Sequence, residues 1–297
     1  MRELVVISGK GGTGQTSLTA AFAFLAKNIV LCDADVDASD LHLLTEPFVM
    51  QKSDFKGGFL ASINKELCMQ CNICVSMCRF GAIDEALEIS KLECEGCGIC
   101  VDFCPANAIA FTEKTCGQWF VSQTRMGPMV HARLGIAEEN SGKLVSLVRQ
   151  EAKKLAQAYQ RELIITDGPP GVGCPVIASI GDATALLVIV EPSVSGIHDM
   201  DRVVQLARRF RVPVMVCVNK WDINQKQTAE IEIYAEKQGL NFLGKVPYDA
   251  LFTQSMVQRK TIFEHDPSSE TCRVVKDIWK RVLRAPEMNV LQHCEFN

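Results

Sequence analysis

The sequence predicts an α/β fold with a doubly wound, mostly parallel sheet and a small α+β domain inserted into it. Short apolar runs alternate with helical stretches along most of the chain, as in units whose strands are buried on both faces. A glycine-rich loop follows the first run, Leu4–Ser8. Eight of the 14 cysteines lie between Cys68 and Cys104, where this alternation stops. A chain of 297 residues suits one large domain or two ordinary ones.

The elements follow from hydrophobic periodicity. The run Leu4–Ser8, an amphipathic stretch at Thr16–Lys27 and a second run at Ile29–Asp33 predict a βαβ unit. Partial alternation over Trp119–Leu134 suggests a hairpin. The later predicted strands are Leu163–Asp167, Leu186–Glu191, Val214–Asn219 and Phe242–Val246, and the later predicted helices are Lys143–Arg161, Asp199–Arg209, Gln225–Gln238 and Thr271–Arg284.

The cysteine-rich segment, residues 62–113, is an internal repeat with an offset of 26 residues. Each copy has the spacing C-x2-C-x2-C-x3-C. The segment holds 3 Lys/Arg and 8 Asp/Glu, so it accounts for the acidity of a chain whose net charge is −4. We therefore expect a small acidic domain at 62–113, inserted into a larger domain formed by 1–61 and 114–285, with a C-terminal tail at 286–297.

Cysteines clustered in a chain without a secretion-signal pattern indicate metal ligands rather than disulfides. The runs resemble those of bacterial ferredoxins with two [4Fe-4S] clusters, in which the fourth cysteine of each run ligates the other cluster. Arg79 departs from that family, which often has proline after the first run. A pair of zinc sites is less favoured, because zinc prefers two pairs of ligands. The resemblance implies one cluster on Cys68, Cys71, Cys74 and Cys104, and another on Cys78, Cys94, Cys97 and Cys100.

A glycine-rich loop joins the first predicted strand to the first predicted helix, where a phosphate-binding loop belongs. Its glycines let backbone N–H groups face phosphate oxygens, and the helix N-terminus adds positive potential. The loop matches G-x-x-x-x-G-K-[ST] except that Gln15 replaces the lysine. The residues expected to bind nucleotide here are Gly9, Lys10, Gly11, Gly12, Thr13, Gly14, Gln15, Thr16 and Ser17.

The segment G-K-G-G-T-G is similar to the deviant P-loop of the MinD/Mrp/ParA (SIMIBI) ATPases, which share their architecture with the nitrogenase iron protein. Three later motifs support this resemblance: Asp33-Ala34-Asp35, Thr166–Gly171 and Asn219–Asp222. The resemblance implies roles for particular residues: catalysis by Lys10, which reaches a partner's nucleotide across a dimer, and by Asp35, which orients the attacking water; magnesium binding by Thr16, Asp33 and Asp167; and adenine contacts by Asn219 and Pro247.

Gln15 is the informative departure from this family. Glutamine has a similar reach to lysine but no charge, so we expect severely reduced hydrolysis, while the loop backbone and magnesium still permit weak nucleotide binding. An engineered inactive variant and a natural pseudo-ATPase both explain it. The other motifs are intact, which favours the engineered change.

The expected function is that of an ATP-binding iron–sulfur protein, homodimeric with nucleotide bound. Two uses of the coupling stay open: assembly of iron–sulfur or other metallocofactors for an apo-acceptor, and ATP-gated electron transfer to a redox partner. The alternatives are a non-hydrolysing electron-carrying ferredoxin on a nucleotide-sensing scaffold and a MinD/ParA-like positioning ATPase. The net charge of −4 argues against a nucleic-acid partner, and the lack of a long apolar run argues against a membrane span, so a cytoplasmic location is expected.

Two isolated cysteines receive weaker hypotheses. Cys174 lies seven residues after Asp167, the offset of a cluster ligand in the nitrogenase iron protein. The stretch Gly135–Gly142, where that family has its second ligand, contains no cysteine. We therefore expect Cys174 to be a small interface residue rather than a ligand, and Cys116 is at most an auxiliary thiol.

Overall fold

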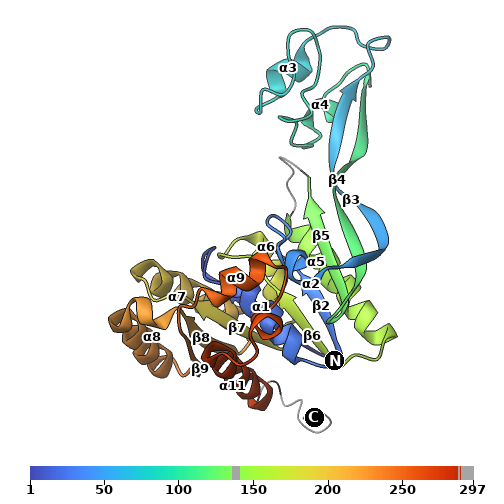
Figure 1. Cartoon of the computed structure of the whole chain (residues 1–297). Coiled ribbons are helices and arrows are strands. Elements are labelled where there is room, and N and C mark those ends of the chain that lie inside the picture. The colour runs from blue at the N-terminus through green and yellow to red at the C-terminus, as the bar shows by residue number, and fades with distance from the viewer. Residues whose placement is uncertain (136–140, 287, 289–297) are drawn as a thin grey trace. The chain divides into compact units, whose positions relative to one another are not determined.

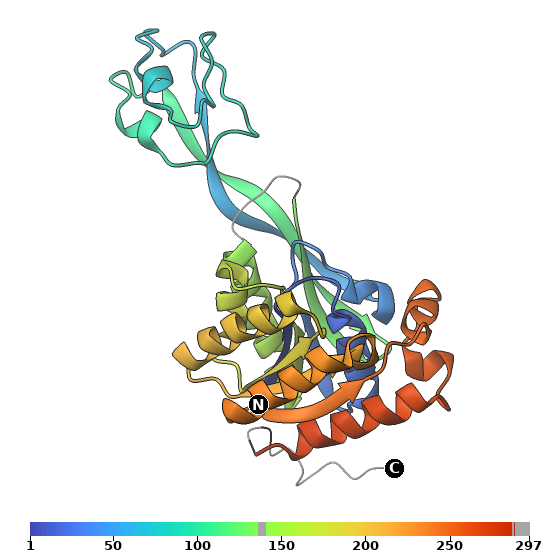
Figure 2. The ribbon, with the colours of Figure 1, turned by 90° about the vertical axis from the view of Figure 1, so that its left-hand side faces the viewer.

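The computed structural model describes residues 1–135, 141–286 and 288, and the chain divides into two compact units (Figures 1 and 2). The α/β unit comprises Met1–Lys52, Trp119–Arg133 and Ser141–Asn297. The cysteine-rich unit comprises Ser53–Gln118 and Leu134–Asn140. The predicted insert, residues 62–113, falls within the cysteine-rich unit. The predicted tail, 286–297, lies outside the described residues apart from 286 and 288.

Nine strands form one sheet in the order β3-β4-β5-β2-β6-β1-β7-β8-β9. The pairs from β5 through β9 in this order are parallel, as predicted for a doubly wound sheet. The strands β4 and β5, joined by two residues, form the hairpin that partial alternation suggested. The strands are β1 (Arg2–Ser8), β2 (Ile29–Asp33), β3 (Phe48–Ile63), β4 (Ile109–Thr124), β5 (Gly127–Leu134), β6 (Leu163–Asp167), β7 (Ala185–Val190), β8 (Val214–Asn219) and β9 (Asn241–Val246).

Most helices of the α/β unit lie between these strands along the chain, and α9, α10 and α11 follow the last strand. Helix α7 begins earlier than the predicted Asp199, because the Ser193 side chain caps it by accepting a hydrogen bond from the Gly196 N–H at 3.1 Å. The helices are α1 (Gln15–Leu25), α2 (Leu41–Thr45), α5 (Ser141–Ala158), α6 (Cys174–Ile180), α7 (Val194–Arg209), the 3₁₀ helix η1 (Trp221–Ile223), α8 (Gln225–Lys237), α9 (Leu251–Val257), α10 (Ile262–His265) and α11 (Glu270–Arg284). The cysteine-rich unit contains α3 (Ile73–Met77) and α4 (Ile99–Asp102).

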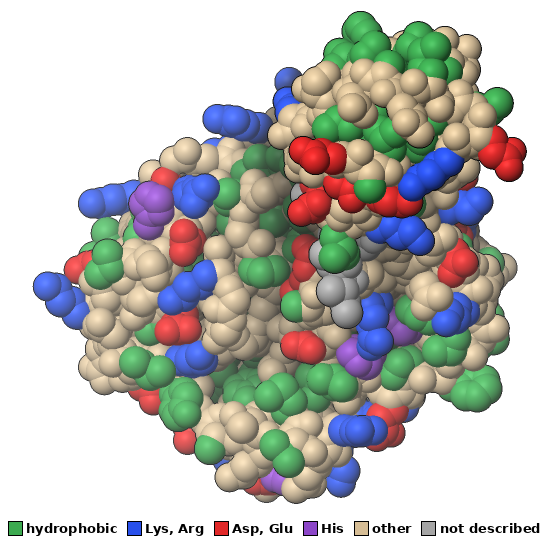
Figure 3. All heavy atoms as spheres, turned by 90° about the horizontal axis from the view of Figure 1, so that it is seen from above, with side chains coloured by type: hydrophobic (Ala, Val, Ile, Leu, Met, Phe, Trp, Pro, Cys, Tyr) green, Lys and Arg blue, Asp and Glu red, His purple; other side chains and the backbone are tan. Residues whose placement is uncertain are grey.

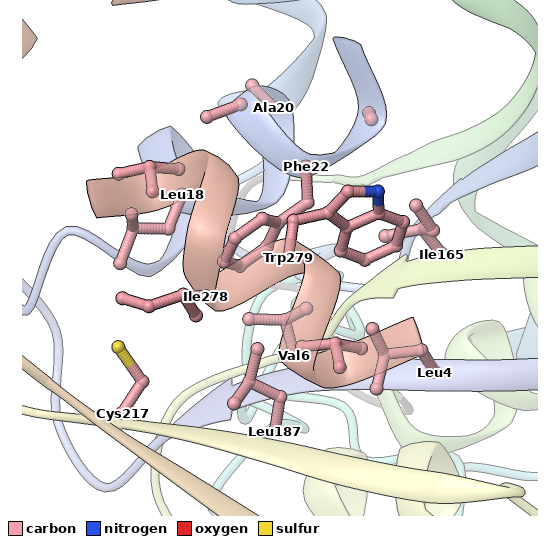
Figure 4. Close-up of a cluster of buried hydrophobic side chains, with 14 of the residues drawn as sticks. Leu4, Val6, Leu18, Ala20, Phe22, Ile165, Leu187, Cys217, Ile278 and Trp279 are labelled. Atoms are coloured by element: carbon pink, nitrogen blue, oxygen red, sulfur yellow. The ribbon is translucent and has the colours of Figure 1, made fainter. Parts of the chain in front are cut away.

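Two apolar clusters cover opposite faces of the sheet. Leu4 and Val6 of β1 belong to one cluster, and their neighbours Val5 and Ile7 belong to the other. This alternation explains the unbroken apolar run of β1, since both faces of the strand are buried. In the first cluster the ring of Phe22 stacks on Trp279 of α11, with centroids 5.4 Å apart (Figure 4).

The apolar face of α11 is thus part of the protein core, as expected for a helix packed on the sheet. The side chains of Val275, Ile278 and Val282 are buried in the same cluster. In the part of the chain that the structure describes, no helix is long and apolar enough to cross a lipid bilayer.

Candidate functional site

The glycine loop lies between the end of β1 and the start of α1. Gly12 and Gly14 have positive φ, of 78° and 82°. A Cβ atom at Gly14 would also come within 2.4 Å of Asn219 Nδ2, so that position requires glycine. Helix α1 starts at Gln15, so the N–H groups of its first turn have no partner inside the helix. The Thr13 hydroxyl is buried without a hydrogen-bond partner, which adds a polar group to the same loop.

Gln15 connects the loop to the end of β6. Its Nε2 donates to Asp167 Oδ1 at 2.8 Å and to the Gly168 carbonyl at 2.6 Å. Its Oε1 accepts a hydrogen bond from Ser8 Oγ at 2.7 Å. The side chain is buried with both ends of its amide satisfied. In this structure Gln15 therefore fixes the orientation of the Asp167 carboxylate.

Two threonine hydroxyls of α1 complete the shell around Asp167. Thr16 Oγ1 donates to Asp167 Oδ2 at 2.7 Å, and Thr19 Oγ1 donates to Oδ1 at 2.9 Å. The predicted magnesium residues Thr16 and Asp167 are thus in direct contact. Sequence reasoning missed Ser8 and Thr19, although Thr19 lies one helical turn after Gln15, a spacing that places both on one face.

Three carboxyl groups gather where β2 and β6 end, because Asp33 and Asp167 are paired in the parallel register of these strands. Burial raises the pKa of Asp33 well above its ordinary value, and the charge of Asp167 adds to this effect. Burial also raises the pKa of Asp167, against the hydrogen bonds from α1. The Asp33 carboxylate accepts a hydrogen bond from Ser39 Oγ at 2.7 Å, a contact that no sequence pattern announced. A buried group of acids is stabilised by a divalent cation, whose charge offsets their mutual repulsion.

Asp35 is half-buried beside these groups. Burial, and next the charge of Asp167, raise its pKa from 3.8 to about 7. The Ala38 N–H donates to its Oδ1 at 3.3 Å. The structure thus brings together Gln15, Thr16, Asp33, Asp35 and Asp167, as the sequence predicted.

The raised pKa of Asp35 makes stability depend on pH. An aspartate that holds its proton more tightly when folded favours the folded state at low pH, and this advantage is lost as the pH rises from about 4 to about 7. Because solvent screens a half-buried group, we expect this loss in the free energy of unfolding to be about 1–2 kcal/mol. Asparagine does not titrate, so the free energy of unfolding of Asp35→Asn relative to the wild type should rise by about 1–2 kcal/mol between pH 5 and pH 8. Urea unfolding at the two pH values measures this difference. The exposed neighbour, in Asp37→Asn, serves as control, and a stability difference for Asp35→Asn that does not vary with pH would contradict the assignment.

Lys10 contacts its own chain. Its Nζ lies 3.2 Å from Ser193 Oγ, 3.3 Å from Ser195 Oγ and 4.0 Å from Glu191 Oε1. Lys220 Nζ also approaches Glu191 Oε2, at 3.4 Å, and donates to the Gly12 carbonyl at 2.8 Å. The role of Lys10 on a second copy's nucleotide therefore stays a prediction.

The two residues predicted to contact adenine lie at the ends of β8 and β9. Asn219 Nδ2 donates to the Thr13 carbonyl at 2.7 Å, which ties the end of β8 to the glycine loop. Pro247 directly follows β9, and the next residue, Tyr248, donates its N–H to Asp222 Oδ1 at 2.6 Å. Asn219 is buried against the loop and Pro247 is half-buried. Their contact with a base stays a prediction.

Two separate cavities of the cysteine-rich unit are lined by the eight repeated cysteines. Their volumes, counted with their open mouths, are about 330 and 390 Å³. Apart from cysteines, the walls are mostly apolar. The first cavity is lined by Cys68, Cys71, Cys74 and Cys104, and the second by Cys78, Cys94, Cys97 and Cys100.

The backbone around these cavities repeats with the same offset as the sequence. The Cys78 N–H donates to the Val75 carbonyl at 3.3 Å, and the Cys104 N–H donates to the Val101 carbonyl at 3.2 Å. Residues with positive φ recur in matched pairs as well: Gln70 with Gly96, Asn72 with Gly98, and Gly81 with Asn107. Hydrogen bonds also cross between the copies symmetrically, from Asn64 N to Ala108 O and from Ser90 N to Ala82 O. The repeat is therefore one structural unit built twice.

The surface of this unit carries both apolar and acidic side chains, and Figure 3 shows the two kinds side by side. Leu92, Met69 and Phe103 are among the exposed apolar residues.

Among residues 1–135, 141–286 and 288, no group of three or more His, Cys, Asp or Glu side chains is placed to hold a single metal ion. None of the 13 described cysteines forms a disulfide.

The isolated cysteines lie apart from these cavities. Cys174 is exposed at the first residue of α6, and Gly142 of α5 packs close to it, since a Cβ there would lie 3.4 Å from Cys174. Most of the stretch Gly135–Gly142 lies outside the described residues. Cys116 is buried in β4, with its Sγ 3.6 Å from the Lys114 carbonyl.

Comparisons with known proteins identify the family to which the α/β unit belongs. The model of the CobQ/CobB/MinD/ParA nucleotide binding domain (CbiA) matches residues 4–262. An uncharacterised protein of Methanocaldococcus jannaschii is 34% identical over 226 residues, which are 75% of this chain and 79% of that protein. A putative septum site-determining protein MinD of Oltmannsiellopsis viridis is 25% identical over 256 residues, 84% of this chain and 65% of that protein.

Among solved structures, the septum site-determining protein MinD of Pyrococcus horikoshii, complexed with Mg-ADP, has the same fold. Its TM-score is 0.59 at 12% identity, with 96% of this chain and 98% of that chain covered. The glycine loop before α1 and the acids at the ends of β2 and β6 lie within the residues that the family model matches. The chain belongs to the CobQ/CobB/MinD/ParA nucleotide binding domain family.

Proposed function

We propose that this chain is an ATP-binding iron–sulfur protein in which the nucleotide state of the α/β unit is coupled to two [4Fe-4S] clusters held by the cysteine-rich unit. The observation that carries the proposal is the division of eight cysteines into two sets of four, each lining its own cavity. Three members of each set come from one run and the fourth comes from the other run. Two-cluster ferredoxins share their ligands in this way.

The chemistry of each cavity fits such a cluster. Four thiols complete the ligand set of one cube, and neither run has a cysteine left over. The apolar residues between the thiols limit the access of water to sulfur. When bound, these clusters supply one-electron redox chemistry.

On the nucleotide side, the N–H groups of the loop and of the first turn of α1 bind the phosphates. Thr16 and Asp167 would hold magnesium, and the 2.7 Å contact between Thr16 Oγ1 and Asp167 Oδ2 supports this role. Asp35 orients a water molecule toward the γ-phosphate, so that ATP and water give ADP and phosphate. Lys10 acts from a second copy of the chain, in a homodimer that nucleotide stabilises.

The coupling between nucleotide state and clusters could serve either of two functions. In cofactor assembly, clusters are labile and pass to an apo-acceptor protein. In ATP-gated electron transfer, clusters stay bound and their reduction responds to nucleotide. The complete ligand sets favour the second version, and transfer of iron to an apo-ferredoxin in the presence of ATP distinguishes the first.

Gln15 supports a second candidate, a ferredoxin on a nucleotide-sensing scaffold that does not hydrolyse ATP. Its amide is fully used in holding Asp167 and Gly168, and it brings no positive charge to the phosphates. ATP turnover of the chain as it stands distinguishes this candidate from an active ATPase.

The similarity to proteins named MinD supports a third candidate, a positioning ATPase. In this candidate function the chain itself would bind a membrane or DNA when ATP is present. Co-sedimentation with anionic vesicles and with DNA, each with and without ATP, tests this candidate.

The decisive experiment is anaerobic purification followed by iron and acid-sulfide analysis and EPR of the reduced protein. We expect about eight iron atoms per chain and an EPR spectrum that changes on addition of ATP. Zinc, or disulfides, at the eight cysteines in anaerobic material would overturn the iron–sulfur proposal. A full iron content with a spectrum insensitive to ATP would overturn the coupling alone.

A further inference from the structure

The two cluster sites differ in the residue that follows the first cysteine of each run. Met69 directly follows the first cysteine of the first run and lines the first cavity. Its counterpart 26 residues later, Glu95, directly follows Cys94 and lines the second cavity. A carboxylate stands at the wall of one cavity where a thioether stands at the wall of the other. Both side chains are exposed, so solvent would screen a charge at either position to a similar degree.

The sites differ a second time, at the cysteine that each run lends to the other cavity. The Ala108 N–H donates to Cys104 Sγ at 3.3 Å, at the first cavity. At the second cavity the matched pair, Ala82 and Cys78, makes no such hydrogen bond among the described contacts. The two observations are independent, because one concerns a side-chain charge and the other a backbone donor.

Both differences act in the same direction on the affinity of a cluster for an electron. A nearby negative charge disfavours the more negative, reduced form, whereas an N–H donor to a ligand sulfur favours it. The carboxylate belongs to the second site and the N–H donor to the first. The charge of Arg79, which follows Cys78, opposes that of Glu95, but Arg79 does not line the cavity and its Cζ lies over the Phe80 ring, 4.7 Å from the centroid. The second site should therefore be the harder one to reduce.

We propose that the two cluster sites are electronically inequivalent, with the first site (Cys68, Cys71, Cys74, Cys104) retaining the electron and the second site (Cys78, Cys94, Cys97, Cys100) passing it on. This inference rests on the proposed function, since it requires both clusters. The step moves one electron from the second site to the first, so one cluster is oxidised as the other is reduced. No bond or proton changes, and a one-electron reductant, dithionite in the experiment, supplies the electron.

The test is a redox titration of the anaerobic, cluster-loaded full chain, followed by EPR. We expect two separate one-electron steps in the wild type. Glu95→Gln, which removes the charge and keeps the size, should raise the lower step, and Met69→Glu should lower the upper one. From the Coulomb energy of one screened charge we expect each to change the distribution of one electron between the sites about fivefold, or about 40 mV.

Two variants serve as controls. Glu85→Gln removes a charge from an exposed residue that lines neither cavity, and it should move both steps less than Glu95→Gln does. Cys104→Ser removes a ligand of the first site, so the step that remains identifies the second. A protein with eight irons that takes up both electrons in one step, unmoved by Glu95→Gln and Met69→Glu, would overturn the inequivalence and leave the proposed function intact. A protein that holds zinc instead would overturn the proposed function itself.

Discussion

Replacing Gln15 by lysine is expected to raise ATP turnover about tenfold or more. A lysine ammonium brings a charge-assisted hydrogen bond to the β- and γ-phosphates, and such bonds contribute about 1.5–3 kcal/mol. The structure tolerates the change, because a lysine Nζ can donate to Asp167 and to the Gly168 carbonyl where Gln15 Nε2 now does. Ser8 keeps a partner as well, since its hydroxyl is also 2.9 Å from the Lys10 carbonyl. The measurement is steady-state phosphate release at saturating Mg-ATP.

The matched control for this prediction is Gln15→Met. Methionine has a similar length but neither charge nor amide, so it should be no faster than the wild type and should loosen the hold on Asp167. Nucleotide affinity measured in parallel separates a change in binding from a change in the chemical step. Equal turnover by the wild type and Gln15→Lys would refute the argument from charge.

Replacing Cys104 by serine is expected to halve the iron content, from about eight to about four atoms per chain. The same substitution should also change which cysteine thiols can be alkylated. Since Cys104 lines the cavity of the first run, its loss should free Cys68, Cys71 and Cys74 for alkylation by iodoacetamide. The cysteines of its own run should stay protected. Mass spectrometry of the alkylated protein reads out each thiol.

Cys174→Ser is the control for this substitution, because Cys174 is exposed and lines neither cavity. It should keep the full iron content. If Cys104→Ser instead frees Cys94, Cys97 and Cys100, each run holds its own cluster and the exchange of ligands between the runs is wrong. Loss of all iron on this one change would mean that the two sites do not load independently.

The central strands β1, β2, β6, β7 and β8 were predictable because each is buried on both faces. A parallel strand between two helical layers leaves no polar position, so a short continuous apolar run favours such a strand. Strand β3, most of whose residues are exposed, was not predicted. The bounds of β2, β6 and β8 match the predicted ones residue for residue, and an acid or asparagine ends each run. Helix α7 was predicted to begin at Asp199 but begins at Val194, because the Ser193 cap that starts it is a local contact of one side chain that hydrophobic periodicity does not reveal.

The candidate site was predictable as a set of residues but not as a network. Thr16, Asp33, Asp35 and Asp167 converge because the carboxyl ends of parallel strands meet at one edge of a sheet. The partners of Gln15 and the attachment of Lys10 to Ser193 and Ser195 depend on side-chain rotamers, which leave no periodic trace in the sequence. The cysteine cavities were the opposite case, since the resemblance to two-cluster ferredoxins implied the same two sets of four cysteines that line them.

The exchange of cysteines between the two runs also sets an order of completion during synthesis. The second cavity has all its thiols once the chain has grown to Cys100, whereas the first must wait for Cys104. A chain that ended between these residues would therefore have four thiols for the second cavity and three for the first. Neither half of the repeat supplies all four thiols of a cavity, so each half depends on the other for a complete set.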